Sequence, residues 1–171
     1  HYYSGSNPER IGNRIAFYAR YTTPRRAVKL GLLAFEALRS RYDIDFHVDF
    51  FGEWEGALDV PYAYTDHGVI SADELGELYR AATVGVAFSS TNYSIVTREM
   101  IACALPVLDL DVESVRAVYP PGTLALAEPN PDRIADELYH LLSDRQYRNG
   151  IVEKALDFVK DLKPSGGTAI N

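Results

Sequence analysis

The sequence predicts an α/β domain in which a doubly wound parallel sheet has helices on both faces, and two observations lead to that prediction. Strand and helix signals alternate along the whole chain, which favours parallel strands joined by helical crossovers. The 171 residues, of which 47% are hydrophobic and 24% charged, suffice for one soluble globular domain with a full core.

The first part of the chain reads as strand, helix and two strands. An apolar run over residues 14–19 predicts the first strand, and apolar side chains then recur over 26–40 at helical spacing. A second strand is predicted over 46–51, where Gly52 closes it, and a shorter third strand over 60–64.

A capping box formed by Ser71 and Glu74 predicts the start of the next helix. The apolar strand 84–88 then runs into a small polar loop and a short helix that carries Glu99. Another apolar strand, 107–110, follows directly.

The last part of the chain predicts a short helix over 112–118 and a strand over 123–127. Asn130 and Pro131 supply the N-cap and first-turn proline of the next helix. A final helix is expected over 147–162, with apolar residues on one side.

These elements place one ligand-binding domain over residues 13–162. Residues 1–12 read as an interdomain linker or an expression remnant, and residues 163–171 read as a tail. Both ends resemble cut ends, so we expect a piece of a larger protein. No apolar run approaches the roughly 20 residues of a membrane span, and the start is not that of a signal peptide.

Charge and cysteine content exclude some classes of function. The net charge of −7 argues against non-specific nucleic-acid binding, so no nucleic-acid partner is expected. The single cysteine, Cys103, rules out an internal disulfide and a multi-cysteine zinc site, and its apolar context indicates an inert core thiol.

Two Asp-x-Asp patterns, at residues 43–45 and 109–111, have a spacing that some metal-dependent sites use. Such short patterns recur by chance, so no metal is expected, and Asp111 is interpreted as the cap of the following helix. His47 and Asp49 share a strand face, which predicts a paired histidine and not a catalytic one. Motifs of dinucleotide dehydrogenases, P-loop proteins and serine α/β-hydrolases are absent from the sequence.

Ligands of open parallel sheets bind beyond the carboxyl ends of the strands, which directs attention to the residues just after each strand. Arg20 follows the first strand, and Arg25 and Arg26 precede the next helix; guanidinium groups there suit a diphosphate. The polar loop 89–94 and the N–H groups that start the Glu99 helix form a second place for an anion.

Each of these features also has an explanation that involves no ligand. The arginines are equally well explained as solvated groups, the loop as an ordinary capped connection, and Glu99 as a solvent-facing helix residue. The residues alone do not choose between Arg25 and Arg26.

Taken together, the residues resemble the C-terminal, donor-binding domain of family-4 (group 1) glycosyltransferases of GT-B architecture. The resemblance covers residues 13–162 and implies a Rossmann-like domain that forms one half of a GT-B fold. Its most specific motif is a pair of glutamates separated by seven residues and followed by Ala-x-Gly-x-Pro-Val. Here Glu99 is the second glutamate, and residues 102–107 resemble the remainder.

The resemblance implies roles for individual residues. Donor diphosphate contacts would come from Arg20, from Arg25 in place of a lysine, and from the amides of Ser94, Ile95 and Val96.

Nucleoside contacts would come from Gly68 and Ile70 at the base and from Glu99 at the ribose. Thr91, Asn92 and Tyr93 would lie at the donor sugar.

Three positions depart from the family pattern. Thr91 replaces the first glutamate, Ser94 replaces a glycine, and Ala104 replaces the glycine before Leu-Pro. Because Thr91 cannot accept hydrogen bonds as a carboxylate does, contacts with the donor sugar must differ. Similar relaxation in rhamnosyl-type members makes a deoxysugar donor such as dTDP-rhamnose an expectation.

The implied activity is retaining, metal-independent hexosyl or deoxyhexosyl transfer from a dTDP-, UDP- or GDP-linked sugar. It requires no cofactor, and a missing N-terminal domain would hold the glycan or other acceptor, so the isolated domain should be inactive. The expected location is cytoplasmic, with attachment to the inner face of the membrane through the missing part. The alternatives are a non-catalytic, receiver-like interaction module and an epimerase-like GT-B relative.

Overall fold

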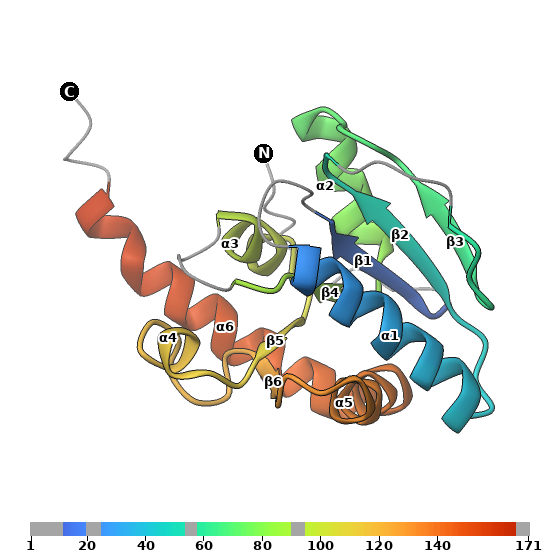
Figure 1. The fold of residues 1–171 in the computed structure, drawn as a ribbon. Helices are drawn as coiled ribbons and strands as arrows, with labels where there is room; N and C mark the ends of the chain where they lie inside the picture. Colours follow the sequence, from blue (N-terminus) through green and yellow to red (C-terminus); the bar gives the residue numbers. More distant parts are fainter. Residues whose placement is uncertain (1–11, 20–24, 54–57, 90–94, 167–171) are drawn as a thin grey trace.

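A computed structural model describes residues 12–19, 25–53, 58–89 and 95–166 of the chain. Within them, six parallel strands form one sheet in the order β3-β2-β1-β4-β5-β6, with helices on both faces (Figure 1). This is the strand order of the Rossmann-type doubly wound sheet, and it confirms the predicted fold class.

The elements follow the predicted alternation of strand and helix. The strands are β1 (Arg14–Tyr18), β2 (His47–Phe51), β3 (Ala63–Asp66), β4 (Val84–Val86), β5 (Val107–Leu110) and β6 (Ala125–Ala127). The helices are α1 (Arg25–Arg41), α2 (Ala72–Ala81), α3 (Ile95–Ala102), α4 (Glu113–Arg116), α5 (Pro131–Ser143) and α6 (Arg145–Gly166).

The third strand lies later in the chain than the sequence predicts. Strand β3 covers residues 63–66, whereas the apolar pattern predicts 60–64. Pro61 has no N–H to donate to a ladder, and the pairing with β2 starts only at Ala63, opposite His47. The shift matters because it places Gly68 and Ile70 immediately beyond the end of the strand.

One face of the sheet packs against α1 and α5 through an aromatic cluster. Phe17 of β1 makes edge-to-face contacts with Phe35 of α1 and Phe50 of β2, at ring-centroid distances of 5.2 and 5.7 Å. The two helices also contact each other, with the rings of Tyr42 and Tyr139 stacked 4.1 Å apart. This layer forms one of the two packed cores of the domain.

The opposite face packs against α2, α3 and α6 (Figure 1). Tyr79 of α2 and Met100 of α3 are fully buried there, as is Cys103, which confirms the interpretation of the thiol as part of the core. Gly85 of β4 allows the close approach of α3, because a Cβ at this position would lie 2.6 Å from the Met100 sulfur.

Helix starts agree with the sequence in two cases and differ in a third. Ser71 and Glu74 form the predicted capping box, and the Asn130 side chain caps α5. Asp111 does not cap α4: the N-cap is Val112, without a side-chain bond, and Asp111 pairs with Arg116 at 3.3 Å. The predicted cap was therefore wrong by one residue.

Ala104 occupies a position where the related motif has glycine. Among the described residues, Ala104 is the non-glycine residue that has a positive φ, with a value of 57°. Left-handed backbone at this point turns the chain from α3 into β5 and explains the glycine of the motif. Alanine retains the turn at a cost of about 1 kcal/mol in backbone strain.

Candidate functional site

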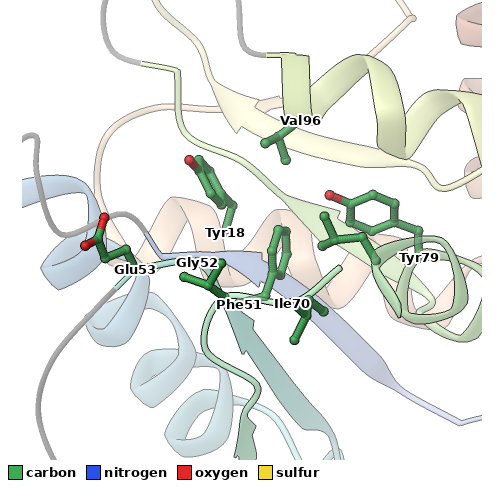
Figure 2. A pocket seen from close by; sticks show the side chains of 9 residues that line it. Tyr18, Phe51, Gly52, Glu53, Ile70, Tyr79 and Val96 are labelled. Atoms are coloured by element: carbon green, nitrogen blue, oxygen red, sulfur yellow. The ribbon is translucent and has the colours of Figure 1, made fainter. Parts of the chain in front are cut away.

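A hollow of about 420 Å³ opens at the carboxyl ends of β1 and β2, beside the point where the strand order reverses between β1 and β4 (Figure 2). In doubly wound sheets this reversal is where ligands bind. The walls come from two strand ends, the loop before α2, and the helices α2 and α3. They consist of Tyr18, Phe51, Gly52, Glu53, Val69, Ile70, Leu75, Tyr79 and Val96.

Three aromatic rings form the walls. Tyr18 and Phe51 are the last residues of β1 and β2, they face the same side of the sheet, and their ring centroids lie 5.5 Å apart. Tyr79 reaches the same place from α2 and meets Phe51 edge to face at 5.6 Å. A flat, apolar group of the size of a nucleobase would match such walls.

Gly52 forms the floor of the hollow. Its φ is 109°, and a Cβ there would lie 2.6 Å from the carbonyl oxygen of Ala19 and 3.1 Å from the Tyr18 ring. The Gly52 N–H donates to the Gly68 carbonyl at 2.9 Å, so two chain segments meet at the floor of the hollow. Only glycine fits this combination of backbone angle and contact.

Gly68 and Ile70, the predicted base-pocket residues, lie in the short loop between β3 and α2. Gly68 has a φ of 63° and donates its N–H to Asp66 Oδ1 at 3.0 Å. Ile70 lines the hollow directly, whereas Gly68 contributes the turn that brings Ile70 there. Their role in ligand binding stays a prediction.

Helix α3 begins at the other side of the hollow. Val96, in its first turn, lines the hollow. The side chain of Ile95 is 71% exposed, whereas Met100 and Cys103 further along the chain are fully buried. The exposure leaves the start of α3 open to an anion.

Glu99 lies one turn further along α3, half-buried beside Tyr79. Burial raises the pKa of its carboxyl group, and a hydrogen-bonding contact with the Tyr79 side chain acts in the opposite direction. Since Tyr79 also lines the hollow, the Glu99 side chain lies beside one of its walls and is only partly exposed to solvent.

Several predicted residues fall outside the described part of the chain: Arg20, Thr91, Asn92, Tyr93 and Ser94. Arg25 is the first residue of α1, but its side chain is also outside what the structure describes.

The two segments that contain these residues leave β1 and β4, on either side of the strand-order reversal.

In the sequence, Asp109 drew attention only as part of an Asp-x-Asp pattern. In the structure it holds the segment that follows β4. Its fully buried carboxylate accepts hydrogen bonds from the Ser89 N–H at 3.1 Å, from the Leu110 N–H at 2.7 Å and from the Ser89 hydroxyl. Burial raises the pKa of Asp109 to about 6, while the three donors lower it. The Asp109 carboxylate thus fixes Ser89, the first residue of the polar loop.

This raised pKa makes stability depend on pH. A carboxyl whose pKa is raised from 3.8 unfolded to about 6 folded favours the fold below pH 3.8, and that contribution is lost as the pH rises through 6. The shift corresponds to roughly 3 kcal/mol. Asp109→Asn should therefore gain stability relative to the wild type between pH 4 and pH 7, measured by urea unfolding.

The matched control is Asp43→Asn, which changes an exposed aspartate. Its unfolding free energy should follow that of the wild type at every pH. A constant difference between Asp109→Asn and wild type across this range would show that Asp109 is ionised throughout.

Sequence reasoning missed most of the hollow's walls. The rule that selected Arg20, attention to residues just after strands, also applies to Gly52 and Glu53 and would have found them. Tyr79 lies on the buried face of α2, and nothing in the sequence indicated that this face meets the end of β2.

Among the described residues, no group of three or more histidine, cysteine, aspartate or glutamate side chains is arranged to hold a metal ion. Within the same residues, no helix combines the length and apolar character needed to cross a bilayer.

Comparison with known proteins identifies the family. A family model described as "Glycosyl transferases group 1" matches residues 12–144. The chain belongs to this family. It is also 32% identical over 139 residues to the O-antigen biosynthesis protein RfbC of Myxococcus xanthus, covering 79% of this chain but 11% of that protein. The chain thus spans about a tenth of this curated relative.

Solved structures share the fold. The C-terminal domain of the group 1 glycosyltransferase LpcC from Francisella tularensis aligns with a TM-score of 0.72 at 18% identity, over 94% of each chain. Alr3699/HepE from Anabaena, crystallised with UDP and glucose, aligns with a TM-score of 0.71 at 14% identity, over 88% of this chain and 44% of that one.

The group 1 glycosyltransferase domain therefore has the Rossmann-like architecture of one half of a GT-B fold. A receiver domain has the strand order 2-1-3-4-5, so the receiver-like alternative was wrong.

Proposed function

We propose that this glycosyltransferase domain binds a nucleoside diphosphate-sugar in the hollow between the ends of β1 and β2 and the start of α3. One observation supports the proposal most strongly: three features lie close together at the strand-order reversal. They are the aromatic, apolar hollow, the exposed start of α3 and the half-buried carboxylate of Glu99. The Anabaena protein of the same fold, crystallised with UDP and glucose, supports this kind of ligand.

The nucleoside would occupy the aromatic part of the hollow. Its base would lie near Ile70 and the Tyr18 ring, with the turn at Gly68 holding that side in place. The Glu99 carboxylate would accept hydrogen bonds from two ribose hydroxyls. Each such bond to a charged acceptor contributes about 1.5–3 kcal/mol.

The diphosphate would lie at the start of α3. The Ile95 and Val96 amides, together with that of Ser94, would donate to its oxygens, helped by the positive end of the helix. Arg20 and Arg25 would add guanidinium groups, which bind paired phosphate oxygens in a fork. Thr91, Asn92 and Tyr93 would lie nearer the sugar.

These groups would support retaining transfer without a metal. As the bond between sugar and diphosphate breaks, negative charge grows on the leaving diphosphate, and fixed N–H donors and guanidinium groups stabilise that charge. The hexosyl or deoxyhexosyl group would pass to an acceptor held by an N-terminal domain outside this chain. A cytoplasmic location, peripheral to the inner face of the membrane, belongs to the same proposal.

Thermal unfolding of the chain with UDP, dTDP, GDP or ADP tests the binding proposal. At a ligand concentration of 100 times Kd, stabilisation of about 2.7 kcal/mol should raise the Tm by roughly 5–10 °C. We expect such a shift with at least one of the four and the same shift in EDTA. The absence of a shift with all four would contradict donor binding, and a shift that needs Mg²⁺ would contradict metal independence.

The epimerase alternative predicts a different product. A full-length protein that contains this domain, supplied with a labelled donor, should move label to an acceptor if it is a transferase. Label recovered only in an epimerised or free nucleotide sugar would favour the alternative.

A further inference from the structure

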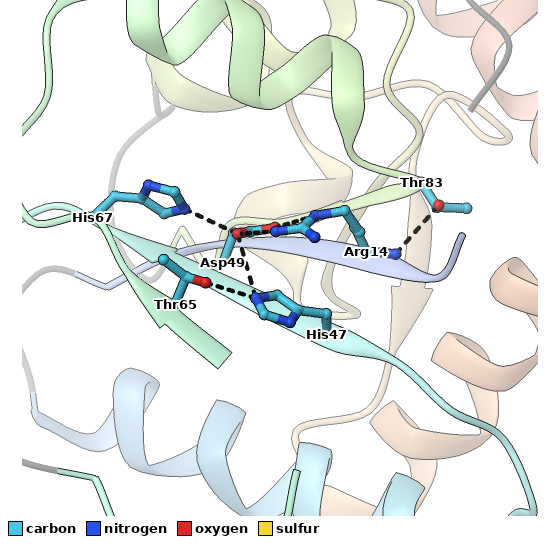
Figure 3. A network of polar contacts seen from close by, with 6 residues as sticks. All are labelled: Arg14, His47, Asp49, Thr65, His67 and Thr83. Carbon is cyan, nitrogen blue, oxygen red and sulfur yellow. Dashed lines mark hydrogen bonds and ion pairs between the residues drawn. The ribbon is translucent and has the colours of Figure 1, made fainter. Parts of the chain in front are cut away.

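A polar network crosses β1, β2 and β3 on the sheet face that also carries Tyr18 and Phe51 (Figure 3). Arg14 of β1 donates two hydrogen bonds to the carboxylate of Asp49 in β2, from Nε at 2.9 Å and from Nη2 at 2.7 Å. His67, just after β3, places Nε2 2.9 Å from Asp49 Oδ1. On the same face, His47 Nε2 lies 2.7 Å from Thr65 Oγ1 and 3.7 Å from Asp49 Oδ1.

Asp49 is only 3% exposed, so its carboxylate depends on these partners. Burying a carboxylate costs several kcal/mol unless charged and polar groups compensate it. Arg14 occupies both carboxylate oxygens, and His67 can donate from Nε2 in its neutral or its protonated form. The arrangement fixes where the His67 side chain lies relative to β1 and β2.

His67 directly precedes the loop that forms one side of the hollow. Its N–H donates to the Phe50 carbonyl at 2.9 Å, and the next carbonyl, of Gly68, accepts from Gly52 at the hollow's floor at 2.9 Å. At the other end, Ser71 and Glu74 form the capping box of α2. The three residues 68–70, including Ile70, are therefore held between two polar anchors.

We propose that His67, held by Asp49 and Arg14, is a positioning residue that sets the shape of the base side of the hollow and so determines which nucleoside diphosphate binds best. The proposal rests on the proposed function, since it assigns base selectivity to that same hollow. His67 touches no ligand; it acts by holding the loop from Gly68 to Ile70 against the ends of β1 and β2.

Variants at His67 test this better than variants at Asp49, whose loss would leave the Arg14 guanidinium without the carboxylate that it pairs with. His67→Leu keeps a side chain of similar size but removes the donor, whereas His67→Gln retains an N–H near the Nε2 position. Calorimetric titration of the chain with UDP, dTDP, GDP and ADP gives the ratio of Kd between the weakest and the preferred ligand.

We expect His67→Leu to reduce this selectivity ratio by about tenfold, the size of one lost hydrogen bond to a charged group, and His67→Gln to restore most of it. Asp136→Asn is the matched control: Asp136 pairs with Arg41 at 2.8 Å and links α5 to α1 on the other face of the sheet. It should lower the Tm and leave the ratio unchanged.

Hydrogen exchange of the Gly52 amide tests the positioning without a ligand. In His67→Leu this amide, bonded to the Gly68 carbonyl, should exchange about ten times faster, as expected when a local anchor is lost. An unchanged ratio and unchanged exchange in His67→Leu would overturn the inference while leaving donor binding intact. If the wild type binds none of the four ligands, donor binding fails, and the exchange rate still decides the positioning role.

Discussion

Replacing Glu99 by alanine is expected to weaken binding of the preferred nucleoside diphosphate about 100-fold, because two hydrogen bonds from the ribose to a carboxylate would be lost. The free protein should unfold at nearly the wild-type temperature. Glu99 is half-buried, and burial raises the pKa of its carboxyl, so the fold gains little from its charge. Calorimetric titration with the preferred ligand measures the change.

Two further variants separate this effect from a general loss of negative charge. Glu153→Ala removes an exposed glutamate from α6 and should leave Kd unchanged. Glu99→Gln should weaken binding at neutral pH. In the wild type, we expect affinity to fall when acidification protonates Glu99, whose pKa is raised, and Glu99→Gln should not show this fall. A Kd for Glu99→Ala within twofold of wild type would refute the ribose contact.

Replacing Gly52 by alanine should reduce the free energy of unfolding by about 2–4 kcal/mol. The backbone adopts a φ of 109°, and the new Cβ would lie 2.6 Å from the Ala19 carbonyl oxygen, which belongs to the main chain and cannot rotate away. The loss corresponds to a Tm lower by roughly 10 °C. The same methyl group would also enter the hollow between Tyr18 and the base position.

Gly150→Ala provides the matched control. Gly150 lies in α6 with nothing within 4 Å of the position that a Cβ would take. Alanine there should stabilise the chain by about 0.5–1 kcal/mol through its higher helix propensity. Equal Tm values for Gly52→Ala and wild type would mean that the Ala19 carbonyl moves aside to make room for the new methyl group, which would contradict this prediction.

Much of the fold follows from local pattern. The alternation of apolar runs and helical spacing predicts the order of strands and helices, because parallel sheets bury both faces and the crossovers must be amphipathic. The third strand was misplaced since a period-two pattern carries no information about where pairing starts, and Pro61 decided that point.

The candidate site was only partly predictable from the sequence. Ile70 and Val96 line one hollow and Glu99 contacts its wall residue Tyr79, although the roles of these residues in binding stay predictions. The anchor at Asp109 was not foreseen, and of the network around Asp49 only the pairing of His47 on the same strand face was predicted. Each joins residues from different strands, and such contacts depend on strand order and register, which short motifs do not encode.

The central claim is that one hollow at the strand-order reversal holds the nucleoside diphosphate, and a crystal structure of the chain with its preferred nucleoside diphosphate tests it most directly. We expect the base between Tyr18 and Ile70, the ribose hydroxyls within hydrogen-bond distance of Glu99, and the diphosphate at the start of α3. A ligand bound at another surface, with this hollow empty, would contradict the account.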